Sequence, residues 1–104
     1  MLIDPDHISG LSQGITTEIL GQDGLSYAPL SPDNLADYGR YLEGLNGPLP
    51  QKLTWTTVAE LRELFRATTA INTLYQVPHG ALRLETVGWA DVPLQGADLK
   101  EAQD

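Results

Sequence analysis

The sequence contains no cysteine. This absence excludes disulfide bonds, metal sites built from thiolates and a cysteine nucleophile. It leaves the redox compartment open, because a chain without thiols is compatible with both oxidising and reducing surroundings.

Basic residues are also scarce, since six Lys and Arg face fourteen Asp and Glu and the formal net charge is −8. Proteins that bind the phosphate backbone of nucleic acids attract it with clustered Lys and Arg, so we expect no nucleic-acid partner. A basic protein surface is an easier partner for this chain. The simpler alternative is that the acidic residues only keep the domain in solution.

The chain has no run of about 20 consecutive apolar residues, so no membrane span is predicted. Its first residues, MLIDPDH, lack a basic segment followed by an apolar stretch, so we expect no secretory signal and a cytoplasmic location.

With 104 residues, 41% of them hydrophobic, the composition is typical of one globular domain spanning 1–104. Within it, we interpret 1–13 as an N-terminal arm or short helical turn and 95–104 as a frayed tail.

The clearest structural signals lie in Ser26–Leu45, where a strand exit is followed by a helix start. We expect a β-hairpin formed by Gly14–Leu20 and the residues from Leu25, because turn residues 21–24 separate the two segments and Pro29 ends the second. Ser31 is then suited to cap a helix that has Pro32 at its first position. The apolar face of this helix is predicted to consist of Leu35, Tyr38, Leu42 and Leu45, and Asn46-Gly47-Pro48 ends it.

A second amphipathic helix is predicted to begin near Val58, because Thr57 and Glu60 have the spacing of a capping box. Apolar residues continue at helical spacing as far as Tyr75, with a possible break near Thr69. Ala81–Val87 alternates in a way that favours a third strand. The predicted fold is therefore α+β, with a small antiparallel sheet of the N-terminal hairpin and a C-terminal strand, packed by two amphipathic helices.

Three groups of residues are candidates for a centre of chemistry. Gly10–Gly14 matches the G-x-S-x-G pattern of serine hydrolases. That motif needs a strand before it and a helix after it, whereas the sequence here predicts little strand before it and a strand after it. The cluster of Asp4, Asp6 and His7 has oxygen and imidazole ligands without a recognisable metal spacing, and His79 has no nameable acid or nucleophile beside it. We therefore predict no catalytic residue, no metal site and no cofactor.

Two pairs of residues are candidates for contact with a partner. Asp33 and Asp37 lie four residues apart on the first helix, where they form either an acidic binding face or a solvated one. Tyr41 lies beside the predicted apolar face, and Trp89 follows a predicted strand end. Aromatic residues in such positions can serve as hot spots of a protein interface or as a stacking surface.

The segment Tyr27-x-Pro29-Leu30-Ser31-x-x-Asn34-Leu35 resembles the opening of small bacteriophage tail-gene proteins, including tail assembly chaperones. The resemblance covers Ile15–Leu42 at most. It implies binding without catalysis, with exposed helix faces or the tail engaging virion or assembly proteins in the virion or the host cytoplasm. It assigns no role to any individual residue.

The sequence thus favours a non-enzymatic protein–protein interaction or assembly protein of bacteriophage origin, with protein partners and a possible homo-oligomer. One alternative is an acidic inhibitor or nucleic-acid mimic that binds a basic protein. Another is a small metal-dependent enzyme that uses His7, His79 and nearby carboxylates.

Overall fold

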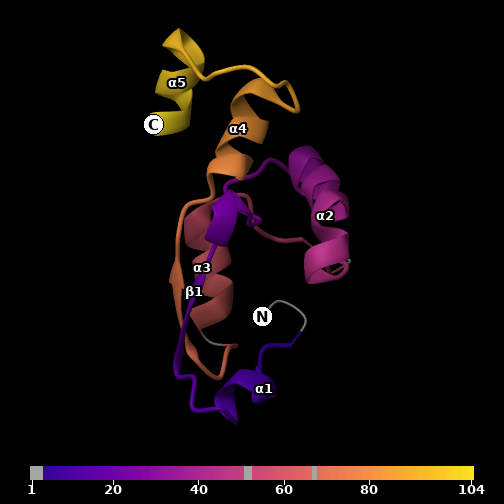
Figure 1. Cartoon of the computed structure of the whole chain (residues 1–104), viewed down its shortest axis with the longest axis vertical. Coiled ribbons are helices and arrows are strands. Elements are labelled where there is room, and N and C mark those ends of the chain that lie inside the picture. The colour runs from indigo at the N-terminus through magenta and orange to yellow at the C-terminus, as the bar shows by residue number, and fades with distance from the viewer. Residues whose placement is uncertain (1–3, 51–52, 67) are drawn as a thin grey trace.

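The computed structural model describes residues 4–50, 53–66 and 68–104, which form an elongated body of 46 × 24 × 22 Å (Figure 1). It is a small α+β fold. The elements in chain order are α1 (Ile8–Leu11), β1 (Thr17–Leu20), the 3-10 turn η1 (Gln22–Gly24), α2 (Pro32–Asn46), α3 (Val58–Arg66), β2 (Asn72–Tyr75), α4 (His79–Val87) and α5 (Gly96–Gln103).

None of the helices in these ranges has the length and hydrophobicity of a membrane span. One helical turn, α1, lies in the predicted N-terminal arm, of which residues 1–3 fall outside the described part.

The sheet is parallel, so the predicted antiparallel sheet is wrong. Strand β1 pairs with β2 in a register that places Thr17 opposite Asn72 and Leu20 opposite Tyr75. Between the two strands the chain passes through α2 and α3, and a long crossover of this kind brings strands together in parallel. The pairing is therefore made over a long stretch of sequence rather than across the turn after Leu20.

The segment predicted as the second hairpin strand runs through the core instead. Ser26–Leu30 is buried at four of its five residues, whereas a strand with one solvated face would alternate. Its carbonyls accept side-chain hydrogen bonds: the indole N–H of Trp55 donates to Tyr27 O at 2.9 Å, and the hydroxyl of Tyr75 donates to Ala28 O at 2.8 Å. These two side chains donate the hydrogen bonds that a neighbouring strand would otherwise supply.

Helix α2 has the predicted bounds but a different cap. Ser31 occupies the N-cap position, yet its hydroxyl makes no capping hydrogen bond. The backbone N–H of Ser31 donates instead to Oε1 of Glu85 in α4, at 2.5 Å, and Nδ2 of Asn34 donates to the same oxygen at 3.0 Å. The helix ends at Gly47, whose φ of 75° suits glycine, and Leu45 is 75% exposed rather than part of the core.

The start of α3 is confirmed at Val58, with the capping box in place. The backbone N–H groups of Thr56 and Thr57 donate to Oε2 of Glu60 at 2.8 and 2.9 Å, and the Glu60 N–H donates back to the Thr57 hydroxyl at 3.2 Å. The predicted continuation of this helix to Tyr75 is wrong.

Helix α3 ends at Arg66. The hydroxyls of Thr68 and Thr69 donate to carbonyls of its last turn, those of Leu64 and Phe65. Such bonds favour the end of a helix, and the chain after them extends into β2.

The predicted strand Ala81–Val87 is also wrong, because these residues belong to α4. Ala81 and Leu84, three residues apart, are the buried residues of this helix, so the apolar positions follow a helical spacing that the short alternating pattern concealed. The tail predicted to fray contains α5, a helix with no buried residue. In Figure 1, α5 follows α4 at one end of the molecule.

The core joins α2, α3, α4 and the buried segment after η1. Its buried members are Tyr27, Ala28, Leu30, Leu35, Tyr38, Leu42, Trp55, Leu61, Phe65, Ala81 and Leu84.

The capping box predicts a pH effect on stability. Hydrogen bonds from the backbone of Thr56 and Thr57 lower the pKa of Glu60 from 4.5 to about 2. Because the folded-state pKa is depressed, the stabilisation is present above about pH 4.5 and is lost as the pH falls toward 2. In urea unfolding at a series of pH values, Glu60→Gln should lose part of the acid-induced fall in stability that the wild type shows.

The matched control is Glu63→Gln, which removes an exposed carboxylate of the same helix that pairs with Arg66 at 3.4 Å. This variant should keep the wild-type dependence on pH. Superimposable pH profiles for wild type and Glu60→Gln would contradict the capping role.

Candidate functional site

Three aromatic rings from α2 and the chain after α4 form one cluster, which we call the aromatic patch. The ring centroids of Tyr38 and Tyr41 lie 5.8 Å apart, those of Tyr41 and Trp89 5.2 Å, and those of Tyr38 and Trp89 6.1 Å. Tyr38 is 3% exposed, whereas Tyr41 and Trp89 are 62% and 58% exposed. The patch thus has a buried base and two large rings that face solvent.

Local geometry explains how Trp89 reaches α2. Helix α4 ends at Val87, and Gly88 adopts a φ of 62°, which turns the chain in a way that glycine tolerates best. The guanidinium of Arg83 then donates hydrogen bonds to the carbonyls of Ala90 and Val92, at 3.1 and 2.7 Å. These bonds fix the backbone immediately after Trp89, so the indole is held in place by the loop as well as by the tyrosines.

Tyr38 anchors the patch to the body of the protein. Its phenol packs so closely on α4 that a Cβ added at Gly80 would lie 2.5 Å from the Tyr38 oxygen. Burial raises the pKa of Tyr38, so its hydroxyl stays neutral, and that hydroxyl has no hydrogen-bond partner among the described residues. Tyr38 therefore acts as a fixed, buried support for the exposed rings.

The acidic residues predicted as partner-binding continue the patch along α2. Asp33, Asp37 and Tyr41 follow one another at intervals of four, which places them on one stripe of the helix. Asp33 is exposed, and Asp37 forms an exposed ion pair with Arg40, its Oδ1 lying 3.8 Å from Nη1. The fold thus brings Tyr41 and Trp89 together and places both carboxylates on the helix stripe that contains Tyr41.

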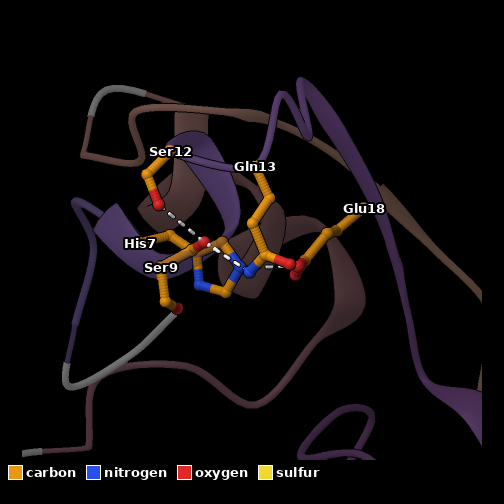
Figure 2. Close-up of polar contacts among 5 residues, drawn as sticks. All are labelled: His7, Ser9, Ser12, Gln13 and Glu18. Atoms are coloured by element: carbon orange, nitrogen blue, oxygen red, sulfur yellow. Dashed lines mark hydrogen bonds and ion pairs between the residues drawn. The ribbon is translucent and has the colours of Figure 1, made fainter.

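The residues considered for catalysis form a different arrangement, shown in Figure 2. Nε2 of His7 lies 2.6 Å from Oε1 of Glu18 in β1, so this pair ties α1 to the sheet. The hydroxyl of Ser12, at the centre of the G-x-S-x-G match, donates to Ser9 O at 3.1 Å, and Gln13 Nε2 donates to the same carbonyl at 2.8 Å. Among the drawn residues, no hydrogen bond joins the serine to the imidazole, so the motif serves as a turn.

The position of the His7 ring explains why residue 10 is glycine. A Cβ added at Gly10 would lie 2.4 Å from ring atoms of His7, so the imidazole lies directly over this glycine. His7 itself has a φ of 45°, in the left-handed region.

The remaining titratable candidates are scattered. His79 is exposed at the first turn of α4. Within residues 4–50, 53–66 and 68–104, no three His, Asp or Glu side chains converge as metal ligands would.

Two residues that shape the site were missed by the sequence analysis. Arg83 and Glu85 lie in the segment predicted as a third strand, yet Arg83 holds the loop that carries Trp89 and Glu85 holds the start of α2. No local pattern marks either residue, because their partners lie elsewhere in the chain.

Comparison of the chain with protein-family models, with curated proteins and with solved structures gave no match.

The different exposure of the two tryptophans can be measured directly. Trp55 is 4% exposed and hydrogen-bonded, whereas Trp89 is 58% exposed. We predict that acrylamide quenches the fluorescence of Trp55→Phe, which retains Trp89, much more strongly than that of Trp89→Phe. Equal quenching of the two variants, each shown by circular dichroism to be folded, would contradict the exposed position of Trp89.

Proposed function

We propose that this protein is a non-enzymatic protein-binding module whose contact surface is the stripe Asp33–Asp37–Tyr41 together with Trp89. The observation that carries the proposal is the contact of Tyr41 and Trp89, two large aromatic rings from distant parts of the chain that meet at 5.2 Å while both stay more than half exposed. Exposed Trp and Tyr are the side chains most often found at the energetic centre of protein interfaces.

The held geometry of the patch favours binding. An interface residue that is already fixed loses less conformational entropy when a partner arrives. Trp89 packs against the rings of Tyr38 and Tyr41, and Arg83 holds the following loop through hydrogen bonds. Tyr41 belongs to α2, a helix of 15 residues. Tyr41 and Trp89 lie outside the core, so their exposed faces are available to a partner.

The chemistry of the surface favours a basic partner. Two exposed carboxylates, those of Asp33 and Asp37, lie on the same helix stripe as Tyr41, and the whole chain carries a net charge of −8. An Arg or Lys side chain can pair with a carboxylate while its cationic group lies over the face of Tyr or Trp. We therefore propose an Arg- or Lys-bearing protein surface as the partner.

A virion or assembly protein is the partner suggested by the resemblance to bacteriophage tail-gene proteins. The helix start at Ser31-Pro32 on which that resemblance depends is present in α2, whereas the hairpin is replaced by the parallel pairing of β1 with β2. Phage origin, self-association and the virion or host cytoplasm as location remain parts of the proposal.

Affinity capture with matched variants tests this function. Wild type, Tyr41→Ala/Trp89→Ala and the control Leu99→Ala are immobilised and exposed to a lysate of phage-infected cells, and retained proteins are identified by mass spectrometry. Leu99 is an exposed apolar residue of α5, so it controls for general stickiness. A specific basic protein should be retained by wild type and by the control, and lost by the double variant.

The affinity of that protein, measured with purified components, should fall at least about tenfold in the double variant, as expected for two hot-spot residues. It should also weaken with added salt. Retention that is unchanged in the double variant would contradict the proposed surface. Strong salt dependence combined with unchanged retention would favour the acidic-inhibitor alternative.

A further inference from the structure

A groove of about 700 Å³ lies along β1, and none of the three rings of the aromatic patch lines it. Its lining includes β1, the end of α2 and the loop that follows it, and the buried face of α3. Representative residues are Ile19, Leu20, Tyr27, Leu49, Leu61 and Phe65. We call this feature the β1 groove.

The groove reaches the edge of β1 as well as the face that carries Leu20. Glu18, Ile19 and Leu20 all line it, although consecutive side chains of a strand point to opposite faces. Three neighbouring residues can share one cavity when their backbone forms its wall. The groove is therefore walled on one side by the main chain of β1.

The backbone at this edge is free to pair. Asn72 N–H donates to Thr16 O and Gln76 N–H donates to Leu20 O, both at 2.9 Å, which shows the side of β1 that faces β2. In a parallel ladder the N–H and C=O groups of alternate residues point to opposite neighbours, so those of Thr17 and Ile19 point away from β2.

No strand of the described part lies on that side of β1, and no backbone hydrogen bond between described residues outside the ladder uses Thr17 or Ile19. Parallel sheets usually contain further strands and have helices on both faces, and an isolated pair of strands has only marginal stability. This sheet therefore offers a place for a further strand.

We propose that the β1 groove binds an extended peptide segment of a partner protein, which adds to β1 as a third strand. Its main chain pairs with the free N–H and C=O groups of Thr17 and Ile19, and alternate apolar side chains enter the groove over Leu61 and Phe65. This is binding by β-augmentation. The inference concerns a second surface and does not depend on the function proposed for the aromatic patch.

Charge around the groove defines the peptide further. The described titratable residues of its lining are Asp4, His7, Glu18 and Asp23, and the single imidazole already pairs with Glu18. A segment flanked by Lys or Arg matches these carboxylates, whereas a second copy of this chain, with its net charge of −8, would add to the repulsion. A basic, alternating segment is therefore the occupant.

The test titrates ¹⁵N-labelled protein with the peptide Ac-Lys-Val-Thr-Val-Thr-Val-Lys-NH₂ and follows amide shifts by NMR. We expect saturable shifts in β1 and in the loop after α2, with the amides around Tyr41 and Trp89 unaffected. The same peptide with Glu in place of both Lys should bind at least about fivefold more weakly, because attraction becomes repulsion. Shifts outside the groove, or equal binding of the two peptides, would overturn the proposal.

Two variants make the test specific. Ile19→Pro removes an N–H that points into the groove while leaving the β2 ladder intact, as proline is tolerated at a strand edge; Ile19→Val keeps that N–H and is the matched control. We expect Ile19→Pro to bind about fivefold more weakly than Ile19→Val, the effect of one lost hydrogen bond. Equal affinities in two folded variants would overturn strand addition.

Leu45→Ser removes an apolar side chain without adding charge and leaves the core untouched, since Leu45 is 75% exposed at the wall of the groove. It should weaken binding of the Val-rich peptide by removing an apolar contact. Unchanged affinity would count against the groove. In sedimentation velocity of the protein alone, Ile19→Pro should leave the oligomeric state of the wild type unchanged. Dimerisation abolished by Ile19→Pro would show that a second copy, rather than the peptide, occupies the groove.

Discussion

The buried segment Ser26–Leu30 is the constraint on which the other elements depend. An irregular segment inside a core must find partners for its backbone polar groups, because an unsatisfied one costs about 1–3 kcal/mol. Here Trp55 donates to Tyr27 O, Tyr75 donates to Ala28 O, and Leu30 N–H donates to Thr56 O at 3.0 Å. These partners come from the chain before α3 and from β2. Pairing the backbone polar groups of this one short segment therefore fixes the position of β2 and of the chain before α3.

The same segment also positions the aromatic patch. It leads directly into Ser31, whose N–H is held by Glu85 of α4, so the start of α2 is tied to the helix that precedes Trp89. Tyr38 then packs against the first turn of α4 at Gly80. With α2 and α4 joined at these two places, Tyr41 and Trp89 meet at the surface. The exposed contact is thus a consequence of the hydrogen bond and the packing that join α2 to α4.

The parts of the fold that the sequence predicted are those set by neighbouring residues. Ser31-Pro32 marks the start of α2, and the pair Thr57 and Glu60 marks the start of α3, because a helix cap needs only residues within one turn. The strand pairing could not be predicted in this way. It depends on a crossover through two helices, and Ala81–Val87 is short enough to fit both an alternating and a helical pattern. Tyr41 and Trp89 were each recognisable as candidates, but their contact requires the positions of Arg83 and Glu85, which no local pattern reveals.

Native-state hydrogen exchange of the Leu30 amide tests the central role of the buried segment most directly. This N–H belongs to a residue that is 1% exposed and donates to Thr56 O, so it should exchange only when the whole protein unfolds. The account predicts that the free energy of exchange at Leu30 equals the global free energy of unfolding from urea denaturation, while amides of the exposed helix α5 exchange at much lower free energy. Exchange of Leu30 as fast as that of α5 would contradict the account.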